Sequence, residues 1–476
     1  MSRSLVIALI VVATALIAVV GFAIFGGRQT EPIRISESQS GQQGASVVVL
    51  IDFSKSFPAS YRSDGSMVYG FRLEDHRALD ALVTVLAELA SGTPTFKTVW
   101  TQIQTSSITQ NPVCPPIEMT HGIIKREHAL TTREQLRDTL KKCVATVMLQ
   151  GKDQNKLGNF TDISGAIAMA ADIGSAQYTE RILVIISDFL EDLPPGSTPA
   201  HFQLNGERVV LLHRPGTDEQ ENISAYLSRI QGWKQKLLQH GAKTVASLPV
   251  FAVSETRLRA ALRQEELGSS LTILVDCKEN RFPSSSSSGT HLVRIGRTLA
   301  ELSRDMPTPV TALWMSMGTS GFFSKTLPFV EFHPRMIKRD NSMNTVEDFT
   351  KVMEELAHSL PSICRGTTST DISGSLALVC SVDPPAKSSV LLVISDFLDE
   401  GAPSPAPFQL APGTRVVMIH AASSKDHSDP NAFLARRQAW EKRFLESGAT
   451  SVCQIPLITF TRNDLRACLG AKARGK

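Results

Sequence analysis

The chain lacks a strong charge of either sign. Its 476 residues carry 49 Lys and Arg against 46 Asp and Glu, a formal net charge of +3. So small an excess gives no broad electrostatic footprint for holding a polyanion, and we therefore expect no nucleic acid partner. With 42 % hydrophobic residues the chain is otherwise typical of globular protein, and its length favours two or three domains.

Motifs of catalysis and of metal clusters are also missing. The sequence contains no GxSxG, no HExxH and no phosphate-binding glycine-rich loop, so we expect no enzyme. Its seven cysteines include no CxxC pair and no zinc-like spacing. Cys380 and Cys453 stand in apolar contexts, where a free thiol packs as a small core residue. The cysteines thus argue against a disulfide-built exported domain and leave a cytoplasmic location open.

One long apolar run is present, at the amino terminus. Ser4 to Gly27 carry no charged side chain, which is enough to cross a hydrocarbon core of roughly 30 Å as a helix. The run exceeds the core of a cleaved signal and no clear small-x-small site ends it, so a retained anchor over residues 1–28 is favoured over a signal peptide. Arginines flank both ends almost equally, but the very short amino-terminal flank favours export of everything after Arg28. We expect a single-pass membrane protein with its domains on the periplasmic or extracellular side.

Residues 29–45 are polar and rich in Ser, Gln and Gly, as in a flexible tether. Beyond them the chain repeats itself. TDISGAIAMA from Thr161 recurs as TDISGSLALV from Thr370, and RILVIISDFLEDLPPG from Arg181 as SVLLVISDFLDEGAPS from Ser389. The nearly constant offset indicates a duplication of a whole domain, which we place at residues 46–265 and 270–476.

Within each unit buried strands alternate with amphipathic helices. Ser46–Phe53 and Ile182–Phe189 are short, continuous, β-branched runs typical of a parallel sheet buried on both faces. His76–Ala90 has helical spacing of apolar residues, with Gly92 just beyond its end. This alternation predicts two doubly wound, mostly parallel α/β domains of Rossmann-like type, whose ligand sites lie at the carboxyl ends of the strands.

The first strand ends in an Asp-x-Ser-x-Ser triplet, Asp52, Ser54 and Ser56. Alternate positions along an extended turn aim one carboxylate and two hydroxyls the same way. Such oxygen donors suit Mg²⁺, although Ser and Asp at a strand end also serve as turn and N-cap residues. Thr161 before a predicted helix and Asp188 after a second buried strand add two further oxygen donors.

In this order the three segments resemble the metal-ion-dependent adhesion site (MIDAS) of von Willebrand factor type A (vWA) domains. The resemblance covers nearly all the chain after the tether, once per repeat. It implies that Ser54 and Ser56 bind a divalent cation directly, Mg²⁺ or else Mn²⁺ or Ca²⁺, while Asp52, Thr161 and Asp188 bind it directly or through water. It also implies one remaining position for an acidic side chain of a protein partner.

The second unit departs from this pattern. Asp276, Thr370 and Asp396 stand where Asp52, Thr161 and Asp188 stand in the first unit, but both serines are missing. The Lys278 ammonium could neutralise Asp276 and Asp396, which disfavours a metal. We therefore expect a degenerate second site.

Several other polar and aromatic residues have simpler explanations. His213 and His420 are expected to be hydrogen-bonded structural residues, and Trp233 and Trp440 to be packing groups. Asp162 and Asp192 are expected to be a helix cap and a loop charge.

Three functions fit these observations. The favoured one is a membrane-anchored, metal-dependent protein-binding module for adhesion or scaffolding. A structural subunit of a membrane complex that binds no metal is the alternative. A Mg²⁺-dependent hydrolase or phosphotransferase using Asp52 and Asp188 is less favoured, since the Asp52 loop lacks the second carboxylate of a haloacid dehalogenase-like enzyme.

Overall fold

A computed structural model of the chain describes residues 42–470. Short internal segments are excepted, namely 56, 58, 62–66, 70, 106–111, 121–129, 154–155, 174–177, 216–221, 266, 279–286, 319–326, 328, 335–341, 364–368, 383–385, 401–405 and 423. The predicted span Leu5–Phe25 and most of the predicted tether lie outside the described residues. Within the described ranges no helix is both long and apolar enough to cross a bilayer.

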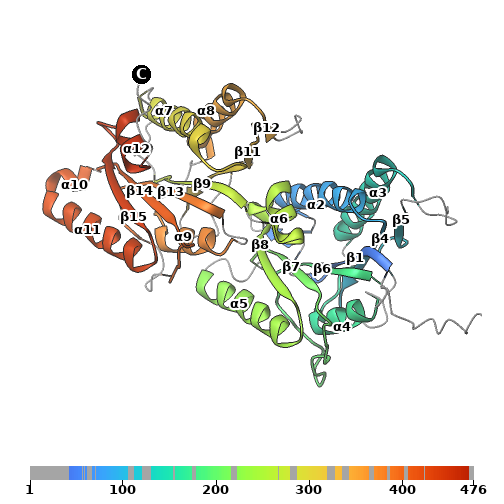
Figure 1. Ribbon diagram of the computed structural model, residues 1–476. Helices are drawn as coiled ribbons and strands as arrows, with labels where there is room; N and C mark the ends of the chain where they lie inside the picture. The colour runs from blue at the N-terminus through green and yellow to red at the C-terminus, as the bar shows by residue number, and fades with distance from the viewer. Residues whose placement is uncertain are drawn as a thin grey trace, which may run out of the picture. The chain divides into compact units, whose positions relative to one another are not determined.

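The first half of the chain forms a six-stranded sheet in the order β5-β4-β1-β6-β7-β8 (Figure 1). Its elements are β1 (Gln42–Asp52), β2 (Ala59–Tyr61), β3 (Met67–Tyr69), α2 (Leu73–Ser91), β4 (Thr95–Ile103), β5 (Ile117–Thr120), α3 (Arg133–Lys152), α4 (Ile163–Ile173), β6 (Tyr178–Ser187), β7 (Arg208–His213), α5 (Ile223–Gln239), β8 (Thr244–Pro249), the short 3-10 helix η4 (Val250–Ala252) and α6 (Glu255–Arg263). All neighbours pair in parallel except β4 and β5. The chain leaves β1 for β4 on one side and returns to β6 on the other, so the carboxyl end of β1 lies at the topological switch point.

The second half forms a seven-stranded sheet in the order β12-β11-β10-β9-β13-β14-β15. Its elements are β9 (Leu267–Asp276), α7 (Ser287–Leu302), η5 (Ser303–Asp305), β10 (Val310–Met317), β11 (Val330–Phe332), β12 (Ser342–Met343), α8 (Val346–Ile363), α9 (Ile372–Cys380), β13 (Ala386–Ser395), β14 (Thr414–His420), α10 (Ser424–Ser428), α11 (Pro430–Glu446), β15 (Ser451–Pro456) and α12 (Arg462–Cys468). β6 lies between β1 and β7, and β13 between β9 and β14. The strands of the repeated Ile-Ser-Asp-Phe segments therefore occupy equivalent positions in their sheets, as the duplication predicts.

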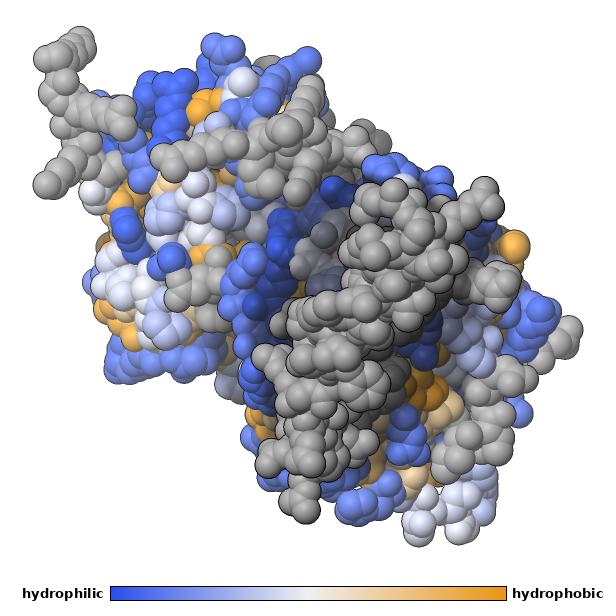
Figure 2. All heavy atoms as spheres, turned by 45° about the vertical axis from the view of Figure 1, so that its right-hand side comes forward, coloured by the Kyte–Doolittle hydropathy of each residue, from blue (hydrophilic) through white to orange (hydrophobic). Residues whose placement is uncertain are grey.

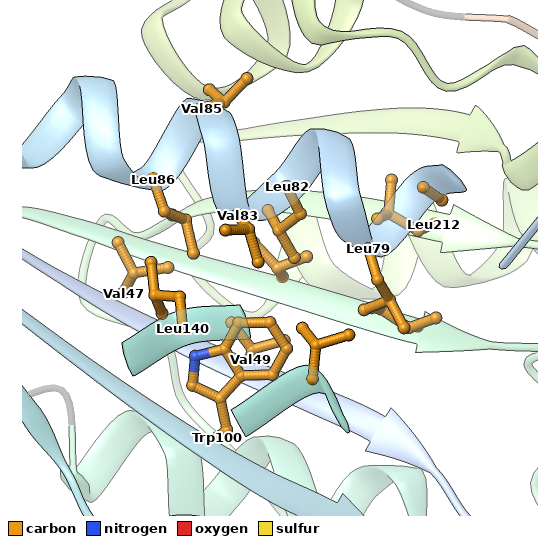
Figure 3. Packing of buried hydrophobic residues seen from close by; sticks show 14 of the residues in the cluster. Val47, Val49, Leu79, Leu82, Val83, Val85, Leu86, Trp100, Leu140 and Leu212 are labelled. Carbon is orange, nitrogen blue, oxygen red and sulfur yellow. The ribbon is translucent and has the colours of Figure 1, made fainter. Parts of the chain in front are cut away.

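Alternate residues of β1 explain why helices cover both faces of the first sheet. Val47 and Val49 pack with α2, α3 and α6, in a cluster that includes Leu82 and Leu140 (Figure 3). Val48 faces the other way, toward α4 and α5. The second sheet is layered likewise, with α7, α8 and α12 against one face and α9 and α11 against the other. On the surface face drawn in Figure 2, hydrophilic residues cover most of the described area, as expected when the apolar faces are turned inward.

Two element boundaries bear on the sequence analysis. α2 spans the predicted helix His76–Ala90 and ends at the C-cap Gly92, as expected. β1 starts at Gln42, inside the segment predicted as a tether, because Gly44 and Ala45 already pair with β4. The Ser/Gln/Gly-rich composition of this segment gives no strand signal, so the first part of β1 was not predicted.

The expectation that the cysteines argue against disulfide-bonded domains, and that Cys453 packs as a free thiol, is wrong. Disulfides join Cys114 to Cys143 and Cys453 to Cys468, and Cys277 is also disulfide bonded. The partners are separated by 29 and 15 residues, and the fold brings their Cα atoms to 5.7 and 5.5 Å. No motif spacing reveals such pairs. Cys380 is a free thiol, as expected.

Candidate functional site

The predicted site residues of the first half lie at one edge of its sheet. Asp52 is the last residue of β1 and Asp188 follows directly after β6, the parallel neighbour of β1. Ser54 comes two residues after Asp52, and Thr161 lies two residues before the start of α4. All four are at most 2 % exposed. Ser56 lies outside the described residues.

Backbone hydrogen bonds hold the three predicted segments together. Lys55 N–H donates to the Gly158 carbonyl (3.0 Å), and Gly158 N–H donates to the Phe53 carbonyl (2.9 Å), so the triplet loop is paired with the segment that leads to Thr161. Thr161 in turn exchanges two hydrogen bonds, of 2.6 and 3.0 Å, with Asp192, four residues after Asp188. These bridges fix the loops as one structure, which alternation of strands and helices alone could not predict.

The two carboxylates of this edge are buried together. The Ser187 hydroxyl and the Ser54 N–H each donate to one oxygen of Asp52, both at 2.7 Å. Burial raises the pKa of Asp52 to about 7, and the nearby negative charge of Asp188 adds to the rise, while the donors on Ser54 and Ser187 oppose it. A cation at this position would favour the charged form of both carboxylates.

Ser187 is a site residue that sequence analysis missed. Its hydroxyl also accepts from the Phe189 N–H (2.8 Å), so it joins the ends of β1 and β6. The available signal is its repetition, because the Ile-Ser-Asp-Phe segment recurs with Ser395, which donates to Asp276 in the same way (2.8 Å).

Trp233 does more than pack. Phe189, directly after Asp188, has a left-handed φ of 60°, and the Trp233 indole N–H donates to its carbonyl (3.1 Å). The Arg229 guanidinium donates to the Asp188 carbonyl (2.9 and 3.2 Å). α5 therefore positions the turn that carries Asp188. In the second half Trp440 binds the carbonyl of Phe397, whose φ is 61°, in the same way.

The residues around the start of α4 act as expected. Asp162 accepts from the Gly165 N–H (2.8 Å) and is a helix cap. A second cap was missed: Glu191 accepts from the Ser164 N–H (2.6 Å). Asp192 contributes its backbone to the bridge with Thr161. None of these three carboxylates replaces a predicted ligand.

Arg214 is a further residue that sequence analysis missed. It follows β7, lies 4.5 Å over the Phe57 ring and forms a buried ion pair with Asp75 (3.6 Å). Phe57 N–H donates to the Ser54 carbonyl (3.3 Å), so Arg214 packs against the turn that carries Ser54. The equivalent residue of the second half is Ala421, and this difference between the repeats was the available signal.

The two histidines have structural environments. His213 is fully buried and contacts the hydroxyls of Tyr226 and Ser247, the latter at 2.7 Å. Burial lowers its pKa to about 3, helped by the positive charges of Lys234 and Arg229. Burial also lowers the pKa of His420 to about 4. Both rings are therefore neutral at pH 7, and the hydrogen-bonded role expected for His213 is confirmed.

The second half holds its equivalent residues in a different arrangement. Asp276, Thr370 and Asp396 are fully buried, and the Thr370 hydroxyl donates to Asp276 (2.5 Å). By contrast, no side-chain hydrogen bond engages the Thr161 hydroxyl in the part of the chain described. The Lys278 ammonium forms an ion pair with Glu400.

The residues of the first edge fit a hard divalent cation. Two adjoining buried carboxylates and hydroxyl oxygens are the donor types that Mg²⁺ prefers. Across the described residues, no group of three or more His, Cys, Asp or Glu side chains is placed to hold a metal ion. A cation at Asp52 and Asp188 would therefore depend on hydroxyl and water oxygens for its other ligands.

Comparisons with known proteins assign no family. No protein-family profile and no curated protein matches the chain. Two structures of proximal thread matrix protein 1 from the mussel byssus are similar at 11 % identity, covering 90 % of this chain and 96 % and 95 % of theirs. Their TM-score is 0.26, which is too low to carry an argument about fold or function.

Proposed function

We propose that this chain is a membrane-anchored protein that binds an acidic group of a protein partner through a divalent cation held by its first half. The proposal rests on one observation above the others. Three segments far apart in sequence, which end in Asp52 and Ser54, Thr161, and Asp188, are hydrogen-bonded together at the carboxyl edge of one sheet. Such edges are where open α/β sheets bind ligands.

The proposed ligands are Asp52, Ser54, Ser56, Thr161 and Asp188, in the pattern that resembles the vWA adhesion site. Mg²⁺, or Mn²⁺ or Ca²⁺ in its place, would supply a positive charge that attracts a carboxylate of the partner. Other residues of the chain orient the proposed ligands. Ser187 donates a hydrogen bond to Asp52, while Arg229 and Trp233 hold the turn that carries Asp188. This function needs no nucleophile or general base.

The second half is proposed to be a scaffold with a degenerate site. Its Thr370 hydroxyl donates to Asp276, and the positions equivalent to Ser54 and Ser56 are Lys278 and Asn280. Disulfides in both halves support the exported location, since such bonds persist in oxidising compartments. Membrane anchoring itself rests on the apolar run of the sequence.

Titration of the full chain in detergent with Mg²⁺ and Mn²⁺ tests the proposal. We expect one calorimetric site per chain, lost in Asp52→Asn and kept in the matched second-half variant Asp276→Asn. Binding that survives Asp52→Asn would place the metal elsewhere. No binding by the folded wild-type chain would favour the structural-subunit alternative, and turnover in a phosphatase screen would favour the enzyme.

A further inference from the structure

A basic cavity lies at the carboxyl end of α2, away from the proposed metal site. Its volume is about 430 Å³, and its lining includes Glu88, Ser91, Arg133, Arg259 and Arg263. These residues come from the end of α2, the start of α3 and from α6. α3 and α6 both contact α2 (Figure 1). The start of α2 adjoins Arg214, and at ~1.5 Å per residue the cavity lies about 20 Å farther along the helix.

Three arginines of the cavity converge on one glutamate. Arg133 reaches one carboxylate oxygen of Glu88 (3.2 Å), and Arg259 donates to the other (2.9 Å). Arg263 donates to the Glu88 backbone carbonyl (3.4 Å) and pairs with the more exposed Glu265 (3.6 Å). The Glu88 and Arg259 side chains are 9 % and 13 % exposed, whereas Arg133 is 44 % exposed. The group therefore keeps excess positive charge, part of it facing solvent.

Glu265 and His333 complete the ionisable lining of the cavity. The His333 ring contacts the buried Glu331 carboxylate (3.4 Å). The excess positive charge of the cavity thus resides on the arginines.

The duplication supplies an internal comparison. Glu88 and Glu301 occupy the same place in two Leu-Ala-Glu-Leu segments, at the ends of α2 and α7. Glu301 forms its ion pair with Arg462 of α12, the counterpart of α6, at 2.8 Å. One arginine is therefore enough to connect these two helices through the glutamate. The additional arginines of the first half, Arg133 and Arg263, need another explanation.

We propose that this cavity binds a small, multiply charged oxyanion that carries phosphate or carboxylate groups. Guanidinium groups present a planar pair of donors that matches both kinds of oxyanion. The cavity volume lies within the range of about 300–1,000 Å³ typical of small-molecule sites. Glu88 holds Arg259 in place, while Arg133 and Arg263 face the ligand. This inference is independent of the proposed metal function.

Isothermal titration of the full chain in detergent with inorganic phosphate and, separately, with citrate tests the inference. EDTA and a constant ionic strength, set with chloride, exclude metal-mediated and general salt effects. We expect one site for at least one of the two probes, and the preferred probe identifies phosphate or carboxylate as the ligand class. Arg133→Ala with Arg263→Ala should weaken binding about tenfold or more, since each removes charge-assisted hydrogen bonds.

Two matched controls complete the experiment. Arg462→Ala breaks the second-half ion pair and should leave anion binding unchanged, as should Asp52→Asn. Should the double variant fold poorly by circular dichroism, Arg133→Ala alone replaces it, because that side chain is partly exposed and its loss disturbs packing least. Absence of binding by either probe, or equal binding by the wild type and the folded arginine variant, would overturn the inference.

Discussion

At Asp52, burial and a neighbouring negative charge should make the proposed metal binding depend on pH. The folded-state pKa of about 7 lies above the ordinary value of 3.8, so without metal the folded state binds the extra proton. Its contribution to stability is full below pH 3.8 and is lost as the pH rises through about 7, with a slope of at most ~1.4 kcal/mol per pH unit. Mg²⁺ needs the carboxylate, so its stabilising effect should grow over the same interval and level off above pH 7.

Urea unfolding at pH 5 to 8, with and without Mg²⁺, measures this effect. The difference between the two free energies of unfolding should increase with pH in the wild type and in Asp276→Asn, and vanish in Asp52→Asn. A Mg²⁺ effect that does not change with pH would show that Asp52 is not the titrating ligand.

Whether an individual residue could be predicted depended on its position in the chain. Asp52, Thr161 and Asp188 were selected by the resemblance to the vWA adhesion site, and they lie together because strand ends and helix starts meet at one edge of a parallel sheet. Ser187 was not, because an inward-facing serine of a strand has no sign of its hydrogen bond to Asp52. The ion pair of Lys278 with Glu400 was not predicted either, since a flexible side chain can reach several carboxylates.

The turns after β6 and β13 offer a matched test of how a helix positions the site. Trp233→Phe and Trp440→Phe each keep an aromatic ring and remove one hydrogen bond, to the carbonyls of Phe189 and Phe397. Each should lower the free energy of unfolding by about 1 kcal/mol. Only Trp233→Phe should also weaken Mg²⁺ binding, because Asp188 directly precedes Phe189. Calorimetric titration of both variants with Mg²⁺ tests this difference. Equal Mg²⁺ affinity in the two variants would show that Trp233 does not position Asp188 for metal binding.

The strands and helices were predictable because burial on both faces leaves continuous apolar runs and amphipathic helices leave a 3.6-residue period. The disulfides were not. Cys114 precedes β5 and Cys143 lies in α3, so their pairing depends on how that helix packs beside the edge strand, and no local pattern of the sequence carries that information.

The two halves keep the same framework and differ in what is added to it. The Asp52–Ser187 and Asp276–Ser395 hydrogen bonds, the left-handed phenylalanines and the tryptophan contacts recur in both. Arg214 and the extra arginines around Glu88 occur in the first half alone at the positions compared. Shared contacts therefore maintain the fold, and the residues confined to one copy are where its function should be sought.

The disulfides also make the proposed location of the chain testable. Both halves contain one, at Cys114–Cys143 and Cys453–Cys468, so both should face an oxidising compartment. Protease added to intact cells or spheroplasts should digest the chain from Gln42 onward. Thiols trapped with a maleimide at harvest, after denaturation, should include Cys380 and exclude the five disulfide-bonded cysteines, Cys277 among them, until a reductant is added. Protection from protease together with labelling of all five would place the domains on the cytoplasmic side and remove the main support for an exported protein.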